Sequence, residues 1–140
     1  MLYFIYNKEE KIKKGFTLVE LLAVIVILAI ILAIAIPSIT GIIENQRKSA
    51  FESNIKMIIK GIEYEMLENP SFDPTSLTYP ADLDTYGGDP NQFTMFIITL
   101  NSGVIKIDAD AKDGGKFSGL CVKDATFNVV NAQETPCEAD

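Results

Sequence analysis

The sequence predicts an α+β protein in which one long N-terminal helix packs on a small antiparallel β-sheet. Three observations indicate this class: residues 21–36 form an unbroken apolar run, apolar side chains then recur at helical spacing to Leu67, and residues 92–130 contain short segments rich in β-branched and aromatic residues. A chain of 140 residues has room for one small domain beyond the apolar run. We therefore expect a single globular domain carried on a helix.

Residues 16–37 are expected to form a membrane-spanning first half of the helix. As a helix, residues 16–36 would rise about 31 Å, close to the hydrocarbon core of about 30 Å. Lys8, Lys11, Lys13 and Lys14 precede this segment, whereas residues 16–140 hold 8 of the 12 basic and 17 of the 19 acidic side chains. Because lysines stay on the cytoplasmic side of a span, we expect residues 38–140 to be exported.

Glu20 is the unusual residue of this segment, since it places a carboxylate at the start of a membrane-length apolar run. An ionised carboxylate at the centre of a bilayer costs roughly 2.5–3.5 kcal/mol, so such a charge usually has a function and a partner. We therefore expect Glu20 to have a function and a partner.

Residues 38–69 are expected to form an amphipathic second half of the same helix, ended by Asn69 and Pro70. A continuous helix over residues 16–68 would be about 80 Å long. Pro37 removes one backbone hydrogen bond and Gly41 lowers helix propensity, so a kink is expected near Pro37. The apolar positions are Ile39, Ile42, Ile43, Ala50, Phe51, Ile55, Ile58, Ile59, Ile62, Met66 and Leu67.

Residues 70–140 are expected to form the globular β-region that covers this helix. Prolines and glycines fill residues 70–90, which predicts a loop with little regular structure. Strands are predicted at residues 92–100 and 103–109, joined by a turn at residues 101–103, and at residues 119–123 and 126–130. An antiparallel sheet of three or four strands would give the apolar face of the helix its partner.

Residues 14–20, KGFTLVE, together with the apolar run that follows, resemble the processing site of type IV prepilins and type II secretion pseudopilins. The resemblance covers about 30 residues, from the lysines to Pro37. It implies that residues 1–15 are a leader peptide, which prepilin peptidase removes by cutting between Gly15 and Phe16. It also implies N-methylation of Phe16, and pairing of Glu20 with the Phe16 amine of a neighbouring subunit.

The function implied by this resemblance is that of a structural subunit of a type IV pilus or a pilus-like filament. The chain would be a single-pass prepilin in the cytoplasmic membrane and then part of a cell-surface helical homopolymer, with minor pilins as further partners. Alternatives are a pseudopilin of a type II secretion machine or of a competence DNA-uptake machine, and a membrane-anchored binding module. Direct binding of nucleic acid is not expected, because the exported part is strongly acidic.

Two other interpretations of the N-terminal segment stay open at this point. Residues 33–35, AIA, fit the cleavage site of a secretory signal peptide, in which case a soluble protein would lose residues 1–35. A plain signal anchor would have the same length and apolarity. Neither interpretation explains the Gly15-Phe16 pair and Glu20 together.

Cys121 and Cys137 are the two cysteines of the chain, and both lie in the part predicted to be exported. By resemblance to type IV pilins they form a disulfide that fixes the C-terminal segment, and in small exported domains two cysteines usually pair. The bridge would close a loop of roughly 17 residues and contribute about 3 kcal/mol. The alternative is a pair of free thiols.

No enzymatic activity, catalytic residue, cofactor or metal is expected. The chain has no histidine, and it lacks a nucleophile motif and a phosphate-binding glycine loop. Residues 108–114, DADAKDG, faintly resemble a calcium loop, but a lysine and Gly119 stand where oxygen ligands would be needed. Asp82, Asp84 and Asp89 are a second acidic group. We interpret both groups as solvated turn residues, with calcium binding as the alternative.

Overall fold

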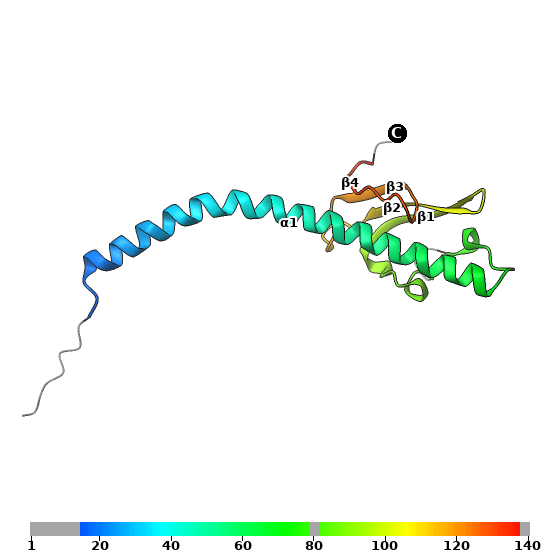
Figure 1. Cartoon of the computed structure of the whole chain (residues 1–140), viewed down its shortest axis with the longest axis horizontal. Coiled ribbons are helices and arrows are strands. Elements are labelled where there is room, and N and C mark those ends of the chain that lie inside the picture. Colours follow the sequence, from blue (N-terminus) through cyan, green and yellow to red (C-terminus); the bar gives the residue numbers. More distant parts are fainter. Residues whose placement is uncertain (1–14, 79–81, 138–140) are drawn as a thin grey trace, which may run out of the picture. The chain divides into compact units, whose positions relative to one another are not determined.

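The structure, a computed structural model, describes residues 15–78 and 82–137, which contain one long α-helix and one four-stranded sheet (Figure 1). This arrangement confirms the predicted α+β class. The chain divides between Thr40 and Gly41 into two compact units. Residues 1–14 of the predicted leader lie outside the described residues.

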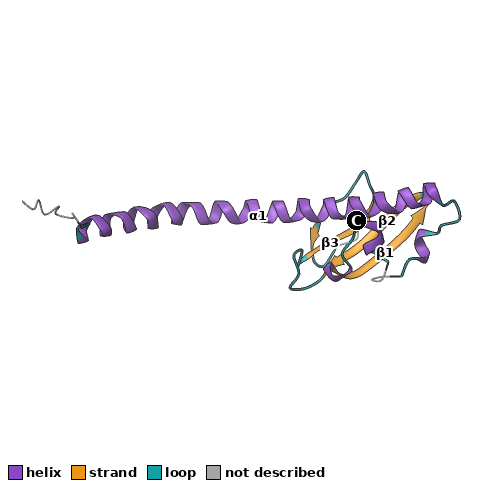
Figure 2. Ribbon diagram, turned by 90° about the horizontal axis from the view of Figure 1, so that it is seen from below, coloured by secondary structure: helices purple, strands orange, loops and turns teal. Residues whose placement is uncertain are grey.

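Helix α1 comprises Leu18–Glu68 and belongs to both units (Figure 2). It begins two residues later than predicted, because Thr17 caps it. At the other end the N–H of Asn69 donates to the carbonyl oxygen of Glu65 at 2.8 Å, and Pro70 follows. Pro37 lies inside α1 without ending it.

The second half of α1 is amphipathic and buries one face completely. Phe51, Ile55, Ile58, Ile59 and Ile62 have no exposed surface, and their spacing of three and four residues places them on one side of a helix. Fully burying a side chain of this size is worth about 1.5–3 kcal/mol. This face therefore holds much of the stability of the second unit.

The sheet that covers this face is antiparallel, with strand order β1-β2-β3-β4 (Figures 1 and 2). Its strands are β1 Phe93–Asn101, β2 Val104–Ala111, β3 Leu120–Ala125 and β4 Gln133–Glu134. Along β2 the buried and less buried residues alternate, as expected for a strand with one face in the core. The main residues that the sheet adds to the core are Phe93, Phe96, Ile105, Ile107, Ala109, Ala111, Leu120, Val122 and Ala125.

Two irregularities in the strand register turn additional apolar side chains inward. Between β1 and β2 the register shifts between Phe93 and Met95, so Phe93 and Phe96 both reach the core although they are three residues apart. A second shift separates Val122 from Ala125 on β3, and both of these are buried. The strand periodicity alone does not predict either shift.

The turn between β1 and β2 is the predicted one, with Ser102 and Gly103 both at positive φ. The strand predicted at residues 126–130 is wrong. Thr126 and Val129 exchange backbone hydrogen bonds of 2.9 and 3.1 Å, which closes a turn there. The short fourth strand instead pairs Gln133 and Glu134 with β3.

The loop before β1 contains three short 3-10 helices, η1 Pro74–Ser76, η2 Asp84–Tyr86 and η3 Pro90–Gln92. Gly61 and Gly88 allow this loop to approach α1 closely. A Cβ at position 61 would lie 2.9 Å from the carbonyl oxygen of Tyr86, and one at position 88 would lie 2.8 Å from Cδ1 of Ile58. These glycines are therefore needed for packing.

Candidate functional site

The N-terminal end of α1 brings together Gly15, Phe16, Thr17 and Glu20, which line an open hollow of about 420 Å³. Thr17 precedes the helix, and its carbonyl oxygen accepts the N–H of Leu21 at 3.1 Å. The hydroxyl of Thr17 accepts the N–H of Glu20 at 3.2 Å, while Oε2 of Glu20 accepts the N–H of Thr17 at 2.9 Å. This reciprocal pair is a capping box, which satisfies two backbone donors at the helix start.

The capping box explains where α1 begins and how Glu20 is oriented. A threonine followed three residues later by glutamate, just before an apolar run, is its sequence signature. That signature is present in residues 17–20. Glu20 stands out in the sequence as a charge at the start of an apolar run and as the expected assembly residue, whereas its partner Thr17 was not predicted.

Within the described part of the chain, Glu20 forms no ion pair. Oε2 accepts one backbone hydrogen bond, and a carboxylate has about four sites that accept hydrogen bonds. The positive end of the helix dipole also favours a negative charge at this position. Glu20 can therefore keep its cap and still accept a cationic donor from another molecule.

Gly15 and Phe16 have no structural role that would explain their identity. A Cβ at position 15 would meet no atom within 4 Å, and the backbone there is not in the left-handed region. Phe16 is 93 % exposed, so its ring packs against no other residue in the described part of the chain. Glycine and phenylalanine at these positions call for an intermolecular explanation.

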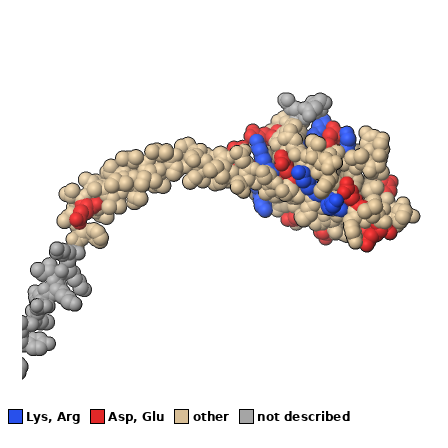
Figure 3. Space-filling model, in the orientation of Figure 1, with Lys and Arg blue, Asp and Glu red and all other residues tan. Residues whose placement is uncertain are grey.

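The surface of α1 that follows is almost entirely apolar and unburied. From Leu18 to Ile36 every side chain except that of Ala35 is exposed. By length and composition this helix is able to cross a membrane. Figure 3 shows the contrast with the second unit, over which the acidic and basic side chains gather.

Pro37 and Gly41, the two residues predicted to weaken the helix, both lie within α1. The hydroxyl of Thr40 donates to the carbonyl oxygen of Pro37 at 3.0 Å. A Cβ at position 41 would meet no other atom within 4 Å. A kink at these residues stays a prediction.

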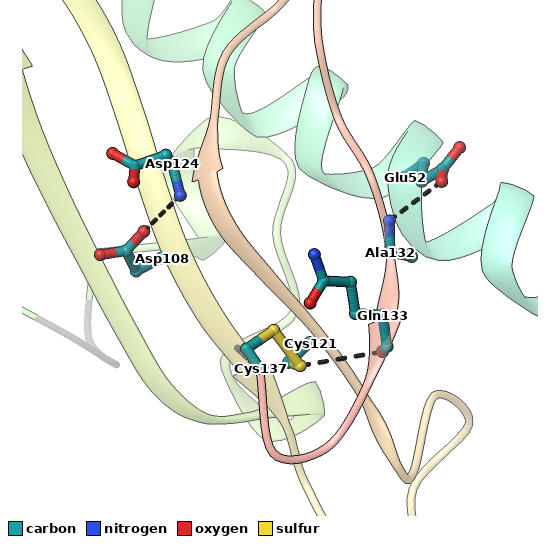
Figure 4. The surroundings of a disulfide bond; sticks show 7 residues. All are labelled: Glu52, Asp108, Cys121, Asp124, Ala132, Gln133 and Cys137. Atoms are coloured by element: carbon teal, nitrogen blue, oxygen red, sulfur yellow. Dashed lines mark hydrogen bonds between the residues drawn. A yellow bond between two sulfur atoms is a disulfide. The ribbon is translucent and has the colours of Figure 1, made fainter. Parts of the chain in front are cut away.

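Cys121 and Cys137 form a disulfide bond with an S–S distance of 2.07 Å (Figure 4). Cys121 lies on β3 and is fully buried, while Cys137 follows β4. The same C-terminal segment is held to α1, because Ala132 donates its N–H to Oε1 of Glu52 at 3.0 Å. An ion pair of 3.5 Å joins Lys48 to Glu134. The end of the chain is thus tied to both the sheet and the helix.

The first of the two acidic groups considered for calcium lies partly on a strand and partly in the turn after it. Asp108 and Asp110 lie on strand β2. Asp108 accepts the N–H of Asp124 at 2.6 Å, which holds Asp124 at a positive φ of 49° (Figure 4). Asp110 lies near the sulfurs of Cys121 and Cys137, but these sulfurs are bonded to each other and are not free to bind a metal.

The second acidic group consists of turn residues that bind local backbone. Asp82 accepts the N–H of Thr78 at 2.9 Å. Hydrogen bonds from the N–H of Asn91 and from the side chain of Gln92 lower the pKa of Asp89. These contacts agree with the interpretation of the group as solvated turn residues.

Comparisons with known proteins identify one segment of the chain. Residues 11–36 match the family described as the prokaryotic N-terminal methylation motif. The searches of curated proteins and of solved structures gave no match. The matched segment contains Gly15, Phe16, Thr17 and Glu20 and most of the exposed apolar part of α1. The chain thus carries the motif that is the signature of the type IV prepilin and pseudopilin family.

Proposed function

We infer that this chain is the precursor of a structural subunit of a type IV pilus. The observation that carries the inference is the end of α1: an exposed glycine and phenylalanine, followed by a carboxylate that forms no ion pair with any described residue. The methylation motif covers these residues and supports a pilin-like or pseudopilin protein.

The first step of the proposed pathway is processing at the membrane. Hydrolysis of the Gly15–Phe16 peptide bond by prepilin peptidase removes residues 1–15 and leaves a free amine on Phe16, which is then methylated. The Phe16–Thr17 peptide bond is untouched, so the N–H of Thr17 remains an amide that donates to Glu20. The mature subunit therefore keeps its capping box.

Assembly then pairs the Glu20 carboxylate of one subunit with the Phe16 amine of another. A lone carboxylate in lipid costs roughly 2.5–3.5 kcal/mol, and a charged hydrogen bond returns about 1.5–3 kcal/mol. The exposed apolar surface between Leu18 and Ile36 supplies the remaining contact between subunits. In the proposed filament each Glu20 pairs with the amine of one neighbour and each Phe16 amine with the carboxylate of another, so the contact is heterologous and repeats into a helical filament with minor pilins as further members.

Substitution of Glu20 tests this proposal. Glu20→Ala should abolish filaments sheared from native cells, while the processed subunit accumulates in the cytoplasmic membrane. Glu44→Ala is the matched control, since Glu44 is an exposed carboxylate of α1 without an ion pair among the described residues. Normal filaments from Glu20→Ala would contradict the proposal and favour a membrane-anchored binding module.

The pseudopilin alternatives predict the same processing but another phenotype. A type II secretion subunit would be needed for export of folded enzymes, and a competence subunit would be needed for uptake of DNA. A deletion strain that loses surface filaments and keeps both activities supports the pilus. The pilus proposal would be contradicted if the parent strain made no surface filaments and the deletion strain lost secretion or DNA uptake.

A further inference from the structure

A groove on the second unit lies between α1 and η2 and is not part of the N-terminal site. It encloses about 690 Å³. Met57, Tyr64, Leu67 and Tyr86 supply apolar surface. Tyr64 and Leu67 are 63 % and 81 % exposed, which is unusual for large apolar side chains of a folded unit.

The rim of this groove is acidic. Glu63 and Glu65 line it together with Lys60, whose Nζ lies 3.8 Å from Oε2 of Glu63, and Asp82 and Asp84 belong to the adjoining loop. Among the described residues Glu65 forms no ion pair. Burial raises the pKa of Tyr86, and the negative charges of Glu65 and Asp82 raise this pKa further. The groove therefore combines an apolar floor with a rim whose carboxylates outnumber its one lysine.

Cations of the same unit gather elsewhere, where α1 meets the loop between β2 and β3. Arg47 donates to the carbonyl oxygens of Ser118 at 2.7 Å and of Lys116 at 3.3 Å, and it forms no ion pair with a carboxylate among residues 15–78 and 82–137. Lys112 and Lys116 are exposed on this loop. In the part of the chain that the structure describes, neither lysine forms an ion pair, with Asp113 of the same loop or with any other residue.

The cationic loop and the acidic groove adjoin different parts of α1, although Met57 lines both the groove and the hollow beside Lys116. Arg47, which binds the loop, and Tyr64, which lines the groove, are 17 residues apart, or about 25 Å along a helix. A unit with opposite charges at separated positions along one axis is suited to head-to-tail contact between identical units.

We propose that the groove formed by Met57, Glu63, Tyr64, Glu65, Leu67 and Tyr86 receives the Lys112–Lys116 loop of a second copy of this chain. The ammonium groups of the two lysines meet the carboxylates of the rim, and their methylene stems cover the apolar floor. This proposal rests on the filament proposed above and gives it a second contact, made by the exported units.

Reciprocal charge reversal tests the contact in the full chain. Glu65→Lys and Lys116→Glu should each lower the yield of sheared filaments about fivefold. The double variant restores an attractive pair and should return the yield to near the wild-type level. Lys123→Glu is the matched control, because Lys123 is an exposed lysine on β3 away from the loop, and it should leave the yield unchanged.

A second measurement separates a lost contact from a lost fold. Thr85→Cys in the groove and Asp113→Cys in the loop, combined in one chain, should give covalent dimers and longer ladders in oxidised filaments. Either cysteine alone should give none.

The outcomes separate this proposal from the filament itself. If wild-type cells make filaments, three results would each overturn the groove contact and leave the pilus intact. These are a normal filament yield from the single charge variants, a double variant whose yield is not restored, and the absence of a disulfide cross-link. Wild-type cells without filaments would overturn the proposed function and this contact with it.

Discussion

The two halves of α1 both carry many large aliphatic side chains, but these lie in opposite environments. From Leu18 to Ile36 the isoleucines and leucines are exposed, whereas Phe51, Ile55, Ile58, Ile59 and Ile62 have no exposed surface. The exposure differs because the described part of the chain provides a covering sheet for only one of the two halves. A sheet covers the second half, while the first half meets no covering element among the described residues.

This comparison separates stability from assembly. Apolar surface gains free energy only when it leaves water, and the second half of α1 achieves this within its own unit. The first half requires lipid or other subunits. Substitutions in the second half should therefore change the unfolding free energy of the second unit, and substitutions in the first half should not.

The largest contrast is expected from removing the same methyl groups in each half. Ile59→Ala leaves a cavity in the core and should lower the free energy of unfolding of the second unit by about 2–5 kcal/mol. Ile30→Ala, at a position that is 57 % exposed, should leave that free energy unchanged. Denaturant unfolding of the full chain in detergent micelles measures both. Equal losses would contradict the division into two environments.

A comparable effect is expected from the disulfide, which serves only the second unit. Cys137→Ser removes the bond to Cys121 and should cost about 3 kcal/mol of unfolding free energy. Reducing agent should lower the stability of the wild type by a similar amount and leave the variant unaffected. A reductant-insensitive wild type would refute the assignment.

A smaller loss is expected at Gly61, where α1 and η2 touch. Its new Cβ would lie 2.9 Å from the carbonyl oxygen of Tyr86, so Gly61→Ala should destabilise the second unit by about 1–3 kcal/mol. Gly41→Ala provides the control, because position 41 is open. The thermal unfolding temperature should fall only for Gly61→Ala. A lower unfolding temperature for both variants would show that the packing of η2 against α1 is not the cause.

The smallest effect is expected at the capping box. Thr17→Ala should weaken the first turn of α1 by about 1 kcal/mol, because the N–H of Glu20 loses its acceptor. Amide hydrogen exchange in that turn should become about fivefold faster, while the unfolding of the second unit stays unchanged. Thr17→Ser keeps the hydroxyl and should behave as wild type; unchanged exchange in Thr17→Ala would rule out the cap.

The sequence predicts regular elements well where one physical signal dominates. The periodicity of apolar residues and the Asn69-Pro70 stop place the end of α1, and the positive-φ turn at residues 102–103 sets the β1–β2 hairpin. The strand expected at residues 126–130 failed because a local turn at Thr126 competes with strand pairing. β-branched composition does not reveal such a turn.

The candidate site was predictable as a motif and less so as a geometry. Gly15, Phe16 and Glu20 stand out in the sequence because together they match the processing site of prepilins. The role of Thr17 depends on a reciprocal pair of hydrogen bonds that only the helix start creates. Contacts between distant segments, such as Gly61 with Tyr86, leave no local signal in the sequence.

The central claim is that the chain is processed between Gly15 and Phe16 to free the amine that Glu20 binds. Intact-mass and N-terminal mass spectrometry of the protein from native cells test it most directly. The account predicts a mature chain that begins at methylated Phe16. A chain that begins at Ile36, or one that retains its leader, would contradict it in favour of a secreted or simply anchored protein.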